Sequence, residues 1–382
     1  MGLKCMKNSL YLLSLFCLSC GNQAMEQYET VVRYESSCLE ASTFLGDYQV
    51  VALATDSDEG LVRNIDRLLL DDDRIFVVDR LANRLLAFDG KGRFVSSTGS
   101  MIGEGPDCYM SMQDASIDQT EKCIYMYCDR PYGVLRLDYD LNLIDMTRLD
   151  FFTEEIALDE DYLYALRVNT DSQDGVLHEL VSLDKSNLSE EPKVLRSSAR
   201  GVRGVTGLGK KMTSSNGSVY ACLPFDNHIY KLAEGEVVED YSFDFGKERL
   251  DSVDYTQNKT ARHFLNDNRQ KSWIIQNVTP SDSIILFNTN RHYLFMFDKG
   301  RNQCLAYYDF INDILPFSST GIIPCQGREN TVVYEATYRM IKRFLNLADQ
   351  SGLDTLDPLF VKMMKQCAED DNPMLLLWKM KK

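Results

Sequence analysis

The stretch LLLDDDRIFVVDRLANRLLAFDGKGRFV, which spans residues Leu68–Val95, contains four short apolar runs separated by polar turns. Asp71–Asp73 and Gly90–Gly92 divide these runs, and aspartate and glycine favour tight reversals of the chain. The runs are rich in β-branched and aromatic residues, which favour a pleated, half-buried strand. The stretch therefore predicts four antiparallel strands connected by short turns, a β-meander.

The same hairpin pattern recurs along the rest of the chain, and an internal repeat decides the architecture before any other feature. Five further hairpins begin at the apolar runs Cys123–Tyr127, Tyr162–Ala165, Ser218–Ala221, Ser283–Leu286 and Thr331–Tyr334. A four-stranded meander is one blade of a β-propeller, so the repeat predicts an all-β, six-bladed propeller of four-stranded antiparallel blades. Each blade has an apolar face that only its neighbours can cover, so the ring must close.

Strands from both ends of the chain are predicted to close this ring. Thr30–Tyr34 and Gln49–Leu53 precede the first full blade, and Met374–Lys379 follows the sixth hairpin. We expect them to share one blade. Two stretches, Tyr255–Trp273 and Thr337–Gln366, break the strand pattern, and the second repeats apolar residues near helical spacing. We interpret both as short helical insertions whose apolar side chains cover the core.

The N-terminus has the pattern of a secretory signal. Lys4 and Lys7 precede the apolar run Leu10–Leu18, which is too short to span a bilayer and ends at Ser19-Cys20. The end of this run resembles a bacterial lipobox, although Cys17 stands where lipoboxes prefer leucine. The resemblance implies that Cys20 becomes the lipid-attachment residue. An uncleaved signal, or one without a lipid, is the alternative.

These features divide the chain into a signal peptide at 1–19, a lipidated N-terminus and short tether at 20–27, and one propeller domain at 28–382. No run of 18 or more apolar residues follows Cys20, so we expect contact with a membrane only through the lipid anchor. The prediction is an exported cell-envelope protein, with the outer membrane as the favoured location. We expect it to be a monomer.

The net charge and the cysteine positions limit which partners and metal sites we expect. The formal net charge of -16 gives a negative field that repels phosphate backbones, so nucleic acid is not expected as a partner. The cysteines after Cys20 are scattered without a CxxC pair, which argues against a metal site. Buried thiols and disulfides both remain open, because export permits oxidation.

A family resemblance rests on Phe88–Phe94 (FDGKGRF), on Gly103–Pro106 followed by Tyr109, and on the ending Asp371–Leu376. These segments resemble the first-blade signature and closing strand of bacterial six-bladed propeller lipoproteins related to NHL-repeat proteins. The resemblance covers about Tyr48 to Lys382. The chain departs from the family at Asp107-Cys108, where the family tends to have Gly-Glu. The resemblance implies the propeller fold and the lipid anchor, and it implies no particular activity.

Motifs for catalysis are missing from the sequence. Its four histidines, which are His178, His228, His263 and His292, have no second ligand at metal-binding spacing, and no GxSxG or HExxH motif occurs. We therefore predict no catalytic residue, no metal ligand and no cofactor. Gly204–Lys211 nearly matches a phosphate-binding loop, but Lys211 replaces the required hydroxyl. The basic cluster Arg196, Arg200, Arg203, Lys210 and Lys211 is either a solvated loop or a site for an anionic partner.

The best candidates for ligand contact lie in the loops between the second and third strands of each blade, which gather on one face of a propeller around its channel. We select Arg80, Arg130, Tyr132 and Arg291 as ligand-binding residues, because charged and aromatic groups around a concavity favour a ligand site. The predicted function is a binding module for a peptide, glycan or partner protein of the envelope. The alternative is a propeller enzyme of the lactonase, lyase or glycan hydrolase type, which uses channel-facing carboxylates and Ca²⁺.

Overall fold

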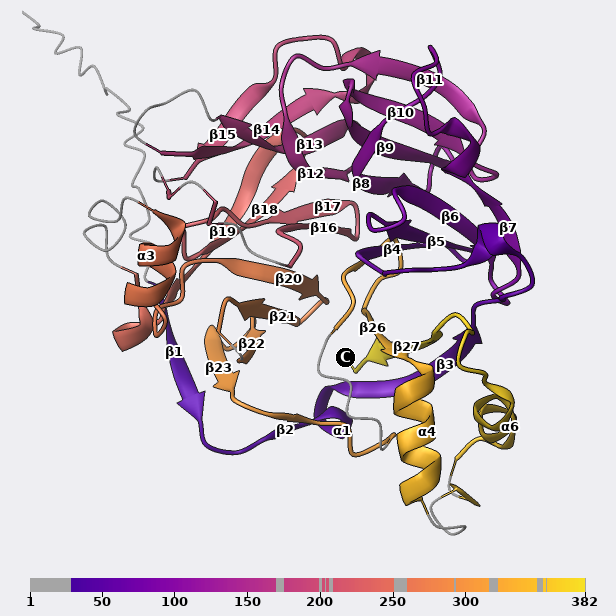
Figure 1. The fold of residues 1–382 in the computed structure, drawn as a ribbon. Helices are drawn as coiled ribbons and strands as arrows, with labels where there is room; N and C mark the ends of the chain where they lie inside the picture. The colour runs from indigo at the N-terminus through magenta and orange to yellow at the C-terminus, as the bar shows by residue number, and fades with distance from the viewer. Residues whose placement is uncertain are drawn as a thin grey trace, which may run out of the picture.

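The computed structural model describes residues 29–169, 175–198, 201–202, 204–205, 209–250, 260–291, 293–315, 322–348, 353–354 and 356–381. The described chain is mostly β-strand, and most strands follow one another as antiparallel meanders arranged around a common centre (Figure 1). The predicted signal peptide, the tether and Cys20 lie outside the described residues. The division of the chain into these segments therefore stays a prediction.

The first three meanders have the four strands that the sequence predicts. The stretch that begins at Leu68 forms the first of them, followed by two separate four-stranded sheets. Their strands are β4 (Arg67–Leu70), β5 (Arg74–Asp79), β6 (Arg84–Asp89) and β7 (Phe94–Ser97); β8 (Ser111–Asp118), β9 (Cys123–Arg130), β10 (Tyr132–Asp138) and β11 (Leu143–Arg148); and β12 (Thr153–Leu158), β13 (Tyr162–Asn169), β14 (Leu177–Asp184) and β15 (Lys193–Ser197).

The fourth and fifth meanders are joined by the N-terminal strand β1 (Thr30–Glu35) into one nine-stranded sheet. β1 lies parallel to the last strand of each meander, so that Thr30 pairs with Phe243 and Val32 with Cys304. The strands are β16 (Met212–Ser215), β17 (Ser218–Ala221), β18 (His228–Ala233) and β19 (Glu236–Asp244), then β20 (Ile275–Pro280), β21 (Ile284–Thr289), β22 (Leu294–Asp298) and β23 (Gln303–Tyr307).

This position corrects the expectation that Thr30–Tyr34 belongs to the closing blade. An alternating strand pattern shows that a segment is extended, but two unpaired strand edges, β19 and β23, decide where it pairs. Val32 is buried against their apolar side chains, which fixes the register.

The second early strand does meet the C-terminus as predicted. β27 (Met374–Met380) lies between β26 (Thr331–Ala336) and β3 (Leu45–Ala52) and pairs antiparallel with both. This sheet has three strands where four were expected. The preceding short strand β25 (Cys325–Gln326) pairs instead with β4 of the first meander, in parallel. A further short parallel pair joins β2 (Leu39–Glu40) to β24 (Phe310–Ile311).

Neighbouring sheets bury their apolar faces against each other. One cluster combines Leu69 and Phe76 of the first meander with Ile124 and Leu135 of the second. Another joins Tyr164 of the third meander to the fourth. The first strands β4, β8, β12, β16 and β20 lie innermost, and successive ones contact each other around the centre (Figure 1). The sheets thus cover one another as the repeat requires.

A repeated aspartate links each of the first three meanders to the next. Asp71 accepts a hydrogen bond from Lys122 Nζ at 2.6 Å, and Asp118 accepts one from Lys185 Nζ at 2.5 Å. Asp159 accepts one from the backbone N–H of Glu234 at 3.0 Å. Each aspartate ends or directly follows an innermost strand, so these contacts fix successive sheets at the same level.

Both predicted insertions contain helices. α3 (Ala261–Asp267) buries Phe264, while α4 (Tyr338–Leu347) buries Ile341 and α6 (Pro358–Gln366) buries Phe360. The remaining helical turns are α1 (Ala41–Phe44), η1 (Asp58–Gly60), η2 (Thr98–Met101), η3 (Lys185–Asn187) and η4 (Gly246–Glu248). Among the described helices none is long and apolar enough to cross a membrane.

Candidate functional site

A buried network of charges occupies the centre where the innermost strands meet. Arg67, the first residue of β4, donates hydrogen bonds to Asp114 of β8 at 2.7 Å and to Glu155 of β12 at 3.3 Å. It also donates to the carbonyl of Met212 on β16 at 2.7 Å. Arg67 and Asp114 have no exposed surface. One guanidinium of the first meander therefore binds strands from the next three meanders.

The basic pair Lys210 and Lys211 completes this network. Lys210 Nζ lies 2.8 Å from Asp114, and Lys211 Nζ lies 3.0 Å from Glu155 and 3.1 Å from Glu154. Both lysine side chains are less than a tenth exposed. One interpretation of the basic cluster required both lysines to bind an anionic partner. Their burial in ion pairs excludes that role. Arg200 and Arg203 lie outside the described residues, and Arg196 stacks over the ring of Tyr230.

The pKa values of several groups in the network are shifted, and burial lowers that of Lys210 despite the nearby Asp114. Burial alone would raise the pKa of Glu155, but the charges of Lys211, Lys210 and Arg67 hold it below the ordinary value. Burial would likewise raise the pKa of Glu154, but nearby His178 and Lys211 lower it to about 2. For Lys211, burial is outweighed by Glu155 and Glu154, and its pKa rises to about 12.

The alternative function, a propeller enzyme, would need carboxylates that are free to transfer a proton or to bind Ca²⁺. Asp114 accepts hydrogen bonds from Arg67, Lys210 and the backbone N–H of Ile156. Glu155 accepts from Lys211 and from the backbone N–H of Met212. These buried carboxylates are therefore already paired with buried cations. Their chemistry suits a structural role better than proton transfer or Ca²⁺ binding.

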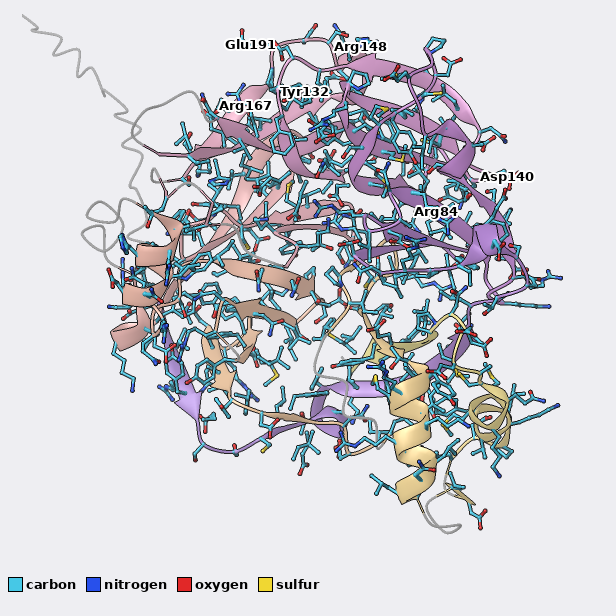
Figure 2. All side chains as sticks on the ribbon, in the orientation of Figure 1. Arg84, Tyr132, Asp140, Arg148, Arg167 and Glu191 are labelled. Carbon is cyan, nitrogen blue, oxygen red and sulfur yellow. The ribbon has the colours of Figure 1, made fainter. Side chains whose placement is uncertain are left out.

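A hollow of about 540 Å³ lies beside the turn that joins β9 to β10. Arg130, Pro131 and Tyr132 form one side of it, and the segment Gly103–Met110, here called the 103–110 loop, forms another. Arg148 at the end of β11 reaches the same hollow, and Figure 2 shows it close to Tyr132 at one end of the second sheet. We call this the arginine hollow. Two guanidiniums and one phenol ring thus line one concavity, together with the carboxylates of Glu104 and Asp129.

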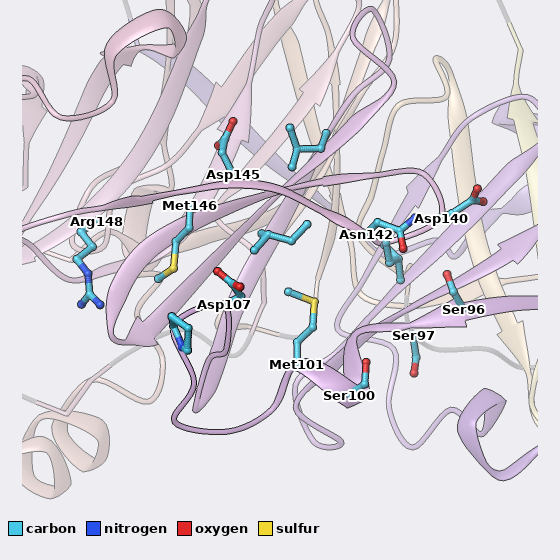
Figure 3. A pocket seen from close by; sticks show the side chains of 14 residues that line it. Ser96, Ser97, Ser100, Met101, Asp107, Asp140, Asn142, Asp145, Met146 and Arg148 are labelled. Atoms are coloured by element: carbon cyan, nitrogen blue, oxygen red, sulfur yellow. The ribbon is translucent and has the colours of Figure 1, made fainter.

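A second, longer hollow of about 800 Å³ continues from the first along β11. It shares Pro106 and Arg148 with the arginine hollow, and Ser96 and Ser97 of β7 line its other wall. Figure 3 shows Arg148 at one end, Asp107 and Met101 in between, and Ser96 with Asp140 at the other end. We call the two hollows together the outer groove.

The side chains of the arginine hollow are available to a ligand. Arg130 and Arg148 are exposed and make no ion pair within the described part of the chain. Tyr132 is 43% exposed, and its ring lies 6.1 Å from that of Phe152. Exposed guanidiniums bind carboxylates and other oxyanions, and an exposed phenol ring contributes apolar contact. The arrangement suits a ligand that is anionic at one end.

Of the four predicted ligand-binding residues, the structure brings two together in one hollow, and a third lies outside its lining. Arg130 and Tyr132 line the arginine hollow directly. Arg80 donates to Gln113 at 3.0 Å, and Gln113 donates to Asp129, which also lines the hollow.

Arg291 lies elsewhere and holds the first helical insertion in place. It donates to Gln270 at 2.7 Å and to the carbonyl of Arg269, and it lies 3.5 Å from Glu248. Arg291 lines neither hollow, so the structure does not place it with Arg130 and Tyr132.

Sequence reasoning missed Arg148 and Asp107. Arg148 ends an outermost strand, whereas the loops predicted to hold ligand contacts join second and third strands. The sequence signal for Asp107 was that this position departs from the resembled family pattern. Only the structure shows that Asp107 lines the outer groove. The axial Arg67, Asp114 and Glu155 were also missed, because single charged residues in separate strands form no local motif.

The cysteines form no disulfide in the described part of the chain, where all eight are free thiols. Cys123 lies with Asp118 and Glu121 in a group that has metal-binding spacing. Asp118 is already paired with Lys185, and burial raises the pKa of the Cys123 thiol to about 12. The thiolate that a metal requires is therefore disfavoured, so we assign no metal site there.

Comparisons with known proteins give a family and a fold. The profile of a domain of unknown function, DUF4934, matches residues 30–379. A crystal structure of a presumed exported protein from Bacteroides fragilis NCTC 9343 is similar over 92% of this chain and all of that one, with 20% identity and a TM-score of 0.66. At this identity the similarity shows the fold alone.

More remote matches include BamB from Moraxella catarrhalis, with 13% identity, coverage of 76% of this chain and 72% of that one, and a TM-score of 0.41. Hydrazine synthase of Kuenenia stuttgartiensis matches with 9% identity, 79% and 84% coverage, and a TM-score of 0.40. Both scores are too low to support an argument. No curated protein matches the chain. The resemblance to NHL-repeat lipoproteins stays a prediction.

Proposed function

This chain belongs to the DUF4934 family, and we propose that its member described here is an exported, lipid-anchored binding module whose outer groove holds a peptide, a glycan or a partner protein. The scaffold that we propose is a six-bladed propeller. Its blades are the three separate sheets, the two meanders joined by β1, and the sheet of β26, β27 and β3. The pairing of β3 with β27 supports closure through the two chain ends.

The signal-like N-terminus supports export and anchoring. Lys4, Lys7 and the run Leu10–Leu18 precede Cys20, as in a lipoprotein signal. A lipid anchor would leave the domain from residue 28 onward as the part that meets partners. The similar Bacteroides fragilis protein is also presumed to be exported, which agrees with the proposed location.

One observation supports the binding function: Arg130, Arg148 and Tyr132 come from two different segments and line one hollow, and neither arginine forms an ion pair with another described residue. The rest of the chain has an excess of acidic residues, with a formal net charge of -16. Within the described part of the chain, the two exposed arginines are available to an oxyanion. Binding is favoured over catalysis because the axial carboxylates are neutralised by Arg67, Lys210 and Lys211.

The test uses the chain from residue 28 onward against two probes, a displayed peptide library and an array of defined oligosaccharides. Ligands should be retained by the wild type and by the control Arg339→Ala/Arg343→Ala, whose arginines are exposed on α4. They should be lost by Arg130→Ala/Tyr132→Ala/Arg148→Ala. The proposal fails if neither probe yields a ligand, or if the groove variant binds every ligand as tightly as the wild type.

A further inference from the structure

The strand β1 shows how an extended segment occupies the space between neighbouring meanders. It runs parallel to β19 on one side and to β23 on the other. Thr30 and Val32 point inward and are buried, whereas Val31 is 62% exposed. The outermost strands of two meanders thus form a slot that accepts a third strand with alternating side chains inward and outward.

Two other slots of this kind are filled by the chain itself. The short pair β2 and β24 packs between the fifth meander and the last sheet. The turn η1 contacts β7 of the first meander and accepts a hydrogen bond from Asn372, which precedes β27 of the last sheet. The slot between the first and second meanders is the long hollow of the outer groove, lined by Ser96 and Ser97 of β7 and by residues 143–146 and Arg148 of β11. Like the β1 slot, it is bordered by the outermost strands of two neighbouring meanders, but among the described residues no strand lies between them.

The groove also has the chemistry that strand addition needs. β7 and β11 are both edge strands of their sheets, so each presents a row of backbone N–H and C=O groups without a ladder partner. Met101 and Met146 add flexible apolar surface to the lining. An extended peptide would gain main-chain hydrogen bonds from the edge and apolar contacts from the lining.

Charge and direction decide which peptide fits. A guest that repeats the parallel orientation of β1 runs along β11 from Leu143 towards Arg148, so its C-terminus arrives at the arginine hollow. Arg148 and Arg130 then face the terminal carboxylate, which they can bind with charge-assisted hydrogen bonds. Asp107, exposed in the middle of the groove, faces the guest chain and favours a basic side chain there.

Resting on the binding function proposed above, we propose that the outer groove captures the extended C-terminal segment of a partner polypeptide. The segment adds as a strand parallel to β11, and its terminal carboxylate binds Arg148 and Arg130. Tyr132, Pro131 and Met110 contact its last side chain. Glycans and internal protein segments lack this combination of a strand backbone and a terminal carboxylate.

The experiment uses hexapeptide libraries presented with a free carboxyl end, and the same peptides with an amidated end. Selected peptides should bind the wild type at least tenfold more tightly with a free carboxylate than with an amide. Methylation of backbone nitrogens on the face towards β11 should weaken binding, whereas methylation on the opposite face should not. Arg148→Ala should bind the free and amidated forms equally, while Arg339→Ala keeps the difference.

The outcomes separate this inference from the proposed function. Equal binding of free and amidated peptides by the wild type overturns the inference. Oligosaccharide binding that depends on Arg130 and Tyr132, without any peptide ligand, overturns the inference and leaves the proposed function standing. A variant with a filled groove, Ile144→Trp at a lining position that is 49% exposed, provides a second readout. It should abolish peptide binding while its melting temperature stays near that of the wild type, and undiminished peptide binding by this folded variant contradicts the inference.

Discussion

The guanidinium of Arg67 donates a hydrogen bond to the carboxylate of Asp114 at 2.7 Å, and neither side chain has any exposed surface. The two residues stand on the innermost strands β4 and β8, which belong to neighbouring meanders. Further bonds from Arg67 reach β12 and β16. A single side chain therefore connects the innermost strands of four meanders at the centre of the fold. Apolar packing alone could not specify which of these strands meet.

Removal of this cation should destabilise the whole domain. Arg67→Met leaves Asp114 and Glu155 buried with fewer neutralising charges, and breaking a buried ion pair costs about 3–5 kcal/mol. Urea unfolding of the domain measures the change in the free energy of unfolding. The control Arg63→Met removes an exposed arginine and should change it by less than about 0.5 kcal/mol. Equal effects of the two variants would contradict a structural role for Arg67.

Glu154 should make stability depend on acid pH. Its pKa falls from 4.5 to about 2 in the folded protein, so its stabilising contribution is complete above about 4.5 and is lost as the pH falls through about 2. At pH 7 the free energy of unfolding of the wild type should exceed that of Glu154→Gln by about 3 kcal/mol. This difference should vanish near pH 2.

Unfolding by urea between pH 7 and pH 2 measures this difference. Glu160→Gln, at an exposed position of the same meander, should differ from the wild type by the same small amount at every pH. A difference between Glu154→Gln and the wild type that does not change with pH would show that the Glu154 carboxylate is not held in its charged form by the fold.

The pairing of the chain ends should be essential for stability. Trp378 on β27 has no exposed surface, and its ring centroid lies 4.5 Å from that of Tyr48 on β3. Trp378→Ala should cost about 3–5 kcal/mol, because it opens a cavity in the sheet that joins the two termini. Lys379→Ala changes the next, exposed residue of the same strand and should have little effect. Similar melting temperatures for the two variants would argue against closure through β27.

Lipid attachment is predicted at Cys20 and can be tested by metabolic labelling with radioactive palmitate in a bacterial host. Cys20→Ala should lose the label and move from the membrane to the soluble fraction, since the acyl chains provide the membrane affinity. Cys17→Ala removes the neighbouring cysteine and should keep both the label and the membrane location. Label retained by Cys20→Ala would contradict the predicted lipobox.

Local sequence patterns were sufficient for most of the fold. The alternation in Leu68–Val95 and its five later copies predicted the meanders, and the loss of that alternation in Tyr255–Trp273 and Thr337–Gln366 predicted the helical insertions. Arg130 and Tyr132 were also found from their place in a turn between strands. These features depend on residues close together in the chain, where periodicity and turn chemistry act directly.

By itself, the sequence determined that the chain forms repeated β-meanders with apolar faces and that both ends supply strands. Only the tertiary structure decided that β1 joins β19 and β23, that Arg148 meets Arg130, and that Arg67 pairs with Asp114 and Glu155. The physical reason is that these contacts connect segments separated by many residues. Their partners are chosen by which strand edges and buried charges remain unsatisfied once the sheets have packed.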